Sequence, residues 1–211
     1  MKKILILINL TLLTVMASAQ SMEGQSAVSV KTGVGGTGLF IKAAAARINE
    51  SSGDSTTERE VVSQNNPAIA LEYGYSISDN FSIGILGSVQ VYTGTIKNYG
   101  FIAFDNKFKV ENVDYNIRRT FFGVTPNYHW NTDNEKLDLY SGGRIGYVVW
   151  SNKFDTNDPN FEFPERFRLG RPAVGIVPIG GTAYFTENLG GNFELALGAP
   201  FILSAGLEFR F

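Results

Sequence analysis

Five ionisable side chains recur within stretches of the chain in which apolar residues occupy every second position: Lys31, Glu72, Arg144, Glu194 and Glu208. A period of two is typical of a strand, so each charged residue falls on the face opposite the apolar one. If the strands lie side by side, each of the five residues is a similar number of positions from the short turn at the end of its strand, so the five should lie at the same level. Charges in a narrow interior are costly to desolvate unless they are paired and hydrogen-bonded. We therefore expect Arg144 and Lys31 to bridge Glu72, Glu194 and, as a further member, Glu208.

The sequence contains one histidine, His129, and no cysteine. Catalysis by a histidine needs a nucleophile and an orienting acid in mutual reach. His129 falls on the inward face of its strand, close to a turn and beside Trp130, where a polar anchor is commoner than a base. Its spacing from the carboxylates does not match a metal site. We expect no catalytic residue, no metal and no cofactor, and a protein that is not an enzyme.

One motif suggests nucleotide binding, because residues 33–38 fit the pattern G-x-G-x-x-G and the alanines at 43–46 could open a helix. A dinucleotide site needs an α/β unit around that motif. No further amphipathic helix follows in the sequence. We interpret residues 28–41 as a strand whose glycines leave room in a crowded interior.

The clearest strand covers residues 201–211, where six apolar residues alternate with small or polar ones: Phe201, Leu203, Ala205, Leu207, Phe209 and Phe211. Similar alternation predicts strands at residues 28–41, 68–77, from 81 onward, up to 130, 137–151, 172–185 and 189–198. Short turns at 78–80, 131–136 and 186–188 alternate with long loops at 48–66, about 98–116 and 152–170. Eight strands joined in this way predict an all-β, closed, eight-stranded antiparallel up-and-down transmembrane β-barrel.

The first 19 residues have the organisation of a secretory signal peptide: Lys2 and Lys3, then an apolar run, then the small residues Ala17-Ser18-Ala19. We expect cleavage after Ala19 and a single barrel domain over residues 20–211. Without Lys2 and Lys3, 16 basic residues face 20 acidic ones, a net charge of −4 that makes no electrostatic case for nucleic acid. No other stretch approaches the ~20 apolar residues of a membrane-spanning helix.

The leader, the eight alternating strands and the final Phe211 resemble the small eight-stranded outer-membrane barrels, the family of the OmpA transmembrane domain and OmpX. The resemblance implies location in the bacterial outer membrane and contact with its lipid and lipopolysaccharide. It also implies that the barrel assembly machinery recognises the last strand through Phe209 and Phe211. We further expect a monomer.

The favoured function is a structural or surface-interaction role, with a lumen plugged by charged side chains. A Phe-rich loop is the candidate extracellular binding segment, and its self-packing over the barrel mouth is an equal alternative: Phe154, Phe161, Phe163 and Phe167. Other readings are a transport barrel for hydrophobic or small polar solutes, a lipid A-modifying enzyme, and a soluble lipocalin-like barrel. Eight strands leave an interior just filled by side chains, which argues against a wide pore. A soluble barrel would need its apolar residues inside.

Overall fold

The computed structural model describes residues 23–36, 43, 60–102, 108–130, 132, 134, 136–156 and 168–211, so the predicted signal peptide lies outside the described residues. The strands are β1 (Ser26–Val34), β2 (Glu60–Asn65), β3 (Ala68–Ser78), β4 (Phe81–Ile102), β5 (Phe108–Trp130), β6 (Leu137–Thr156), β7 (Arg168–Tyr184), β8 (Leu189–Gly198) and β9 (Leu203–Arg210). Across these ranges, no helix is long and apolar enough to cross a membrane.

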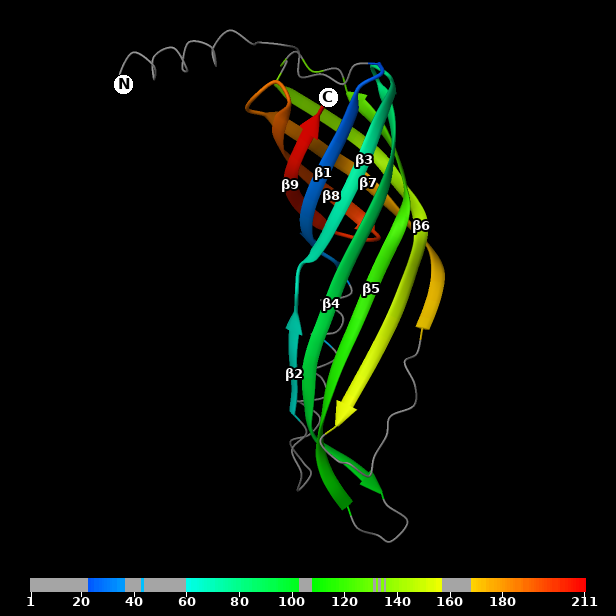
Figure 1. Cartoon of the computed structure of the whole chain (residues 1–211), viewed down its shortest axis with the longest axis vertical. Helices are drawn as coiled ribbons and strands as arrows, with labels where there is room; N and C mark the ends of the chain where they lie inside the picture. The colour runs from blue at the N-terminus through cyan, green and yellow to red at the C-terminus, as the bar shows by residue number, and fades with distance from the viewer. Residues whose placement is uncertain are drawn as a thin grey trace, which may run out of the picture.

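The strands close on themselves into a barrel (Figure 1). Each strand pairs antiparallel with its neighbours in the order β1, β3, β4, β5, β6, β7, β8, β9, and β9 returns to β1. The remaining strand, β2, pairs with the part of β4 that lies beyond the end of β3. Because β2 and β3 occupy the same edge of β4, the nine elements make eight barrel positions. The predicted closed, eight-stranded, all-antiparallel barrel is confirmed.

The long strands β4, β5 and β6 continue beyond the end of β1 and β9 (Figure 1). Residues 60–65 were expected in a loop, and that expectation is wrong because they form β2. The pairing of β4 with β5 continues as far as Ile102 and Phe108, which leaves the far part of β4 with an edge that needs a partner. Pro67, which lacks an N–H donor, separates β2 from β3.

The expected bounds of three other segments also change. The expected loop at about 98–116 is mostly strand, because residues 98–102 belong to β4 and residues 108–116 belong to β5. The first strand ends at Val34, well before residue 41. The expected loop at 152–170 is shorter, because residues 152–156 belong to β6 and residues 168–170 to β7. In the segment that fits G-x-G-x-x-G, the first glycine, Gly33, lies within β1, between β3 and β9. A Cβ atom there would lie 2.6 Å from the carbonyl oxygen of Leu203, so close strand packing explains this glycine.

The barrel has an apolar exterior, and its interior contains many polar and charged side chains beside an apolar cluster. Large apolar side chains are exposed on successive strands: Val30, Leu71, Ile85, Phe122, Ile145, Val174, Leu197 and Leu207. Buried polar side chains alternate with them on all of these strands except β7: Ser29, Lys31, Glu72, Ser88, Arg119, Arg144, Glu194 and Ser204. This distribution is the reverse of the one that a protein surrounded by water adopts.

Phe201 departs from the predicted alternation. It was expected on the outward face with Leu203 and Leu207, and instead it is fully buried. Phe201 precedes β9, which begins at Leu203, so it lies in the connection from β8, where side chains need not alternate. Its ring packs inside the barrel in a cluster with Phe121 and Leu86.

Leu207→Arg should destabilise the inserted barrel, since this outward position on β9 is more than half exposed. If that face meets lipid, we expect a loss of roughly 2–4 kcal/mol in the free energy of unfolding at the bilayer midplane, and less near an interface. Asn116→Arg, at an exposed polar position on the extension of β5, is the control and should change stability by under ~0.5 kcal/mol. Reversible unfolding in lipid vesicles measures both, and unchanged stability of Leu207→Arg would contradict the assigned face.

Candidate functional site

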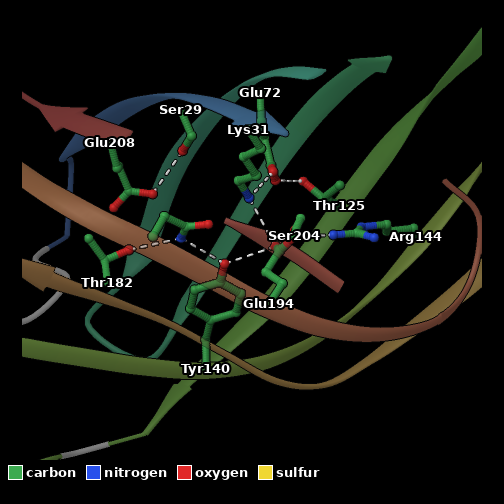
Figure 2. A network of polar contacts seen from close by, with 11 residues as sticks. Ser29, Lys31, Glu72, Thr125, Tyr140, Arg144, Thr182, Glu194, Ser204 and Glu208 are labelled. Carbon is green, nitrogen blue, oxygen red and sulfur yellow. Dashed lines mark hydrogen bonds and ion pairs between the residues drawn. The ribbon is translucent and has the colours of Figure 1, made fainter. Parts of the chain in front are cut away.

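The lumen contains a chain of ion pairs centred on Lys31. The Nζ of Lys31 on β1 lies 2.6 Å from Oε2 of Glu72 on β3 and 2.9 Å from Oε1 of Glu194 on β8. The guanidinium of Arg144 on β6 forms an ion pair with Oε2 of the same Glu194. Figure 2 shows these four side chains meeting from four separate strands. We call them the charged cluster.

Two cations and two carboxylates make the charged cluster electrically neutral. All four side chains are almost fully buried, with 6% or less of each residue exposed. Burial at this level is tolerable because each charge faces an opposite one and the remaining lone pairs receive hydrogen bonds. The cluster therefore joins strands on different sides of the barrel across its interior.

Neutral side chains complete the hydrogen bonding of the two glutamates (Figure 2). The hydroxyl of Thr125 on β5 donates to Oε1 of Glu72 at 2.6 Å. Glu194 accepts from the phenol of Tyr140 at 2.8 Å and from Ser204 on β9 at 3.2 Å. With these contacts, six barrel strands contribute to one polar layer.

Glu208 contacts other partners than the charged cluster. Its carboxylate accepts hydrogen bonds from Ser29 at 2.8 Å and from Tyr184 at 2.6 Å. Ser29 pairs with Glu208 in the register of β1 and β9, two residues along β1 from Lys31. The structure thus brings together Lys31, Glu72, Arg144 and Glu194, and places Glu208 in a neighbouring group closer to the turns.

Towards the extended strands, the charged cluster is covered by apolar side chains. These are Ala68, Ala70, Leu86, Phe121, Val148, Ala199 and Phe201. The guanidinium carbon of Arg144 lies 5.6 Å from the centroid of the Phe201 ring, which links the two layers through a cation–π contact. Further along, Arg119 donates to the carbonyl of Pro200 at 2.8 Å and lies over the Trp150 ring. Side chains therefore fill the lumen over several successive layers.

A second polar group lies at the turn end of the lumen. The Nε2 atom of His129 is 2.8 Å from the hydroxyl oxygen of Ser82, and Nδ1 is 2.9 Å from each carboxylate oxygen of Asp138. A carboxylate accepts only, so Nδ1 carries the proton, and in the neutral ring Nε2 accepts from Ser82. All three residues are buried, with 9% or less exposed. They also line a cavity of about 50 Å³ that reaches the charged cluster.

The sequence analysis placed His129 on an inward face, and the same alternation gives Ser82 and Asp138 inward positions, but nothing in the sequence brought the three together. They are 47 and 9 residues apart along the chain, and no motif marks them. The available signal was positional, because each lies one residue in from the strand end that borders a short turn. Pairing of Phe81 with Tyr128 and of His129 with Tyr140 then brings those three ends side by side.

The remaining predicted residues fall at the edges of the described structure. Phe154 is half-buried on β6, and its expected companions Phe161, Phe163 and Phe167 lie outside the described residues. Phe209 and Phe211 are exposed, and their rings stack with centroids 6.1 Å apart. Among the residues described, no three His, Cys, Asp or Glu side chains cluster as metal ligands.

Three solved structures are similar to this chain. The N-terminal β-barrel domain of Pseudomonas aeruginosa OprF is 12% identical, covers 90% of this chain and 100% of that one, and has a TM-score of 0.47. Yersinia pestis Ail, the attachment invasion locus protein, in complex with the heparin analogue sucrose octasulfate, is 15% identical over 90% and 100%, with a TM-score of 0.45. Escherichia coli outer membrane protein W is 12% identical over 90% and 99%, with a TM-score of 0.38.

No protein-family model and no curated protein matches the sequence. Because all three TM-scores are below 0.5, the evidence for the fold is the strand pairing described above.

Glu194→Ala should be strongly destabilising, because it removes the carboxylate that Lys31 and Arg144 share. Breaking a buried ion pair from one side leaves an uncompensated charge, at a cost of about 3–5 kcal/mol. Asp155→Ala breaks the exposed Lys153–Asp155 pair at 2.6 Å and serves as the control, with an expected loss of at most ~1 kcal/mol. Unfolding of both variants under identical conditions measures the difference, and equal losses would show that the charged cluster contributes no more than a surface pair.

Proposed function

We propose that this protein is an integral outer-membrane barrel with a structural or surface-interaction role and a lumen closed by charged side chains. The observation that carries the proposal is the inverted polarity of a closed barrel, apolar outside and ion-paired inside. In a bilayer, every backbone polar group of a spanning segment must be paired within the protein, and a closed barrel meets that requirement.

The same polarity argues against the soluble, lipocalin-like alternative. A soluble barrel that binds an apolar ligand keeps apolar side chains inside, whereas this lumen contains Lys31, Glu72, Arg144 and Glu194. Exposed apolar residues on every side would be a large unprotected patch in water. Contact with lipid on that face accounts for the exposed apolar residues. In the outer membrane, the contacting molecules would be lipid and lipopolysaccharide.

The charged cluster favours a closed lumen over a transport path. Its ion pairs cross the interior, and the apolar layer with Phe121 and Phe201 lies directly beyond it. An eight-stranded barrel has an interior that side chains can fill, so these two layers suffice to interrupt a continuous column of water.

The extension formed by β2, β4, β5 and β6 supports the surface-interaction part of the proposal (Figure 1). Its described side chains include exposed polar and charged groups, among them Lys97, Asp114, Asn116 and Arg118. Binding sites are often found on segments that a rigid scaffold holds in place, and the barrel is such a scaffold for this extension. We further propose that the barrel is a monomer. The assembly machinery is proposed to recognise β9 through Phe209. This role by itself involves no chemical step.

The proposed location predicts that the folded protein is recovered with outer membranes and changes its gel mobility on heating. A closed barrel resists denaturation by detergent at room temperature and unfolds when boiled, so the two samples should migrate differently. Density-gradient fractions of cells, run with and without boiling, test this. Recovery of folded protein in the soluble periplasmic fraction would contradict the proposal.

A closed lumen predicts little conductance from the purified protein in planar bilayers. Arg144→Ala should raise the conductance, because it removes a buried side chain that anchors Glu194 across the lumen. Arg118→Ala removes an exposed arginine from β5 and should leave the conductance unchanged. Heat-modifiable mobility confirms that each variant is folded. A large, steady conductance from the wild type would refute the closed lumen.

A further inference from the structure

We propose that Ser82, His129 and Asp138 form a nucleophilic triad at the turn end of the lumen, and that it hydrolyses small, uncharged carboxylic esters. The proposal goes beyond the structural role and does not depend on it. Its basis is the continuous hydrogen-bonded relay from Ser82 through His129 to Asp138, together with the cavity that all three line.

The three groups have the roles that such a reaction needs. A serine hydroxyl is a weak nucleophile until a base accepts its proton, and Nε2 of His129 is placed to do so at 2.8 Å. Asp138 contacts Nδ1 through both oxygens, which fixes the orientation of the ring and stabilises the imidazolium that forms.

The strands hold this geometry rigidly. Ser82, His129 and Asp138 belong to β4, β5 and β6, which pair with each other through the barrel wall. The main chain of His129 is bound to Asn80 in the turn before β4, by a 2.9 Å bond from the His129 amide to the Asn80 carbonyl. The ring of Tyr140 packs against the His129 imidazole, with the two ring centroids 5.7 Å apart. Groups on paired strands, with their rotamers confined by packing, are suited to catalysis.

The reaction is balanced by water alone. Ser82 Oγ attacks the carbonyl carbon of the ester while its proton passes to Nε2 of His129, and that proton then leaves with the departing alcohol. Water attacks the acyl-serine, gives a proton to Nε2, and the carboxylic acid departs as the proton returns to Ser82. Asn127 lines the same cavity and carries an amide that can donate to the oxyanion.

The cavity determines the class of substrate. At about 50 Å³ it accommodates a few water molecules or a short acyl group, and not a fatty-acyl chain. Its charged lining includes three carboxylates, from Glu72, Asp138 and Glu208, and one ammonium, from Lys31. This balance disfavours anionic substrates. A short-chain neutral ester therefore fits best.

The main test is ester hydrolysis by the purified, folded barrel in detergent. We expect the protein to hydrolyse 4-nitrophenyl acetate above the buffer rate and to leave 4-nitrophenyl palmitate intact. Ser82→Ala and His129→Gln should each lower the rate about 100-fold or more. Ser88→Ala is the matched control, because Ser88 is an equally buried inward serine on the same strand outside the cavity lining. It should keep the wild-type rate.

A covalent readout separates a reactive serine from a merely hydrogen-bonded one. Incubation with methanesulfonyl fluoride, a probe about as small as an acetyl group, should add one methanesulfonyl group to the folded wild type, located at Ser82 by peptide mass spectrometry. His129→Gln and Asp138→Asn should block the adduct while the heat-modifiable mobility shows that both remain folded. A folded wild type with neither hydrolysis nor adduct would overturn the proposal. Activity that survives Ser82→Ala would overturn it as well.

Discussion

The neutralisation of charges inside a closed barrel is the constraint on which the rest of this structure depends. Lys31, Glu72, Arg144 and Glu194 project into a space too narrow to hydrate each of them separately. They are stable there as an alternating chain of two cations and two carboxylates. Since the four come from four strands, the correct register of every pairing between them is needed to bring the charges into contact. A one-residue slip would turn a charge towards the apolar exterior.

The charged cluster also divides the molecule into two ends with different properties. On one side, the apolar layer fills the lumen, and the extended strands β4, β5 and β6 carry a polar surface beyond it. On the turn side, a small cavity remains between the cluster and the short turns, and Ser82, His129 and Asp138 line it. The proposed surface-interaction role concerns the first end and the proposed chemistry concerns the second, so either proposal can fail without the other.

Much of this architecture follows from alternation that is visible in the sequence. The inward positions of Lys31 and Arg144 and the eight barrel positions derive from a period of two, a local property of the chain. The short turns follow from clusters of polar, turn-forming residues between the strands. Residues 60–65 show no such period, and they form β2 because β4 offers an edge there. Phe201 continues the apolar alternation but lies before β9, in a connection whose direction is set by packing.

By itself, the sequence determined which face of each strand a side chain occupies, because that depends only on its neighbours along the chain. Which inward residues meet was decided by the tertiary structure. Glu208 was expected beside the other charges, yet it contacts Ser29 and Tyr184. His129 had no visible partner, yet it lies between Ser82 and Asp138. Contacts across a lumen depend on the stagger of strands and on closure of the barrel, and these arise only when all eight positions are paired.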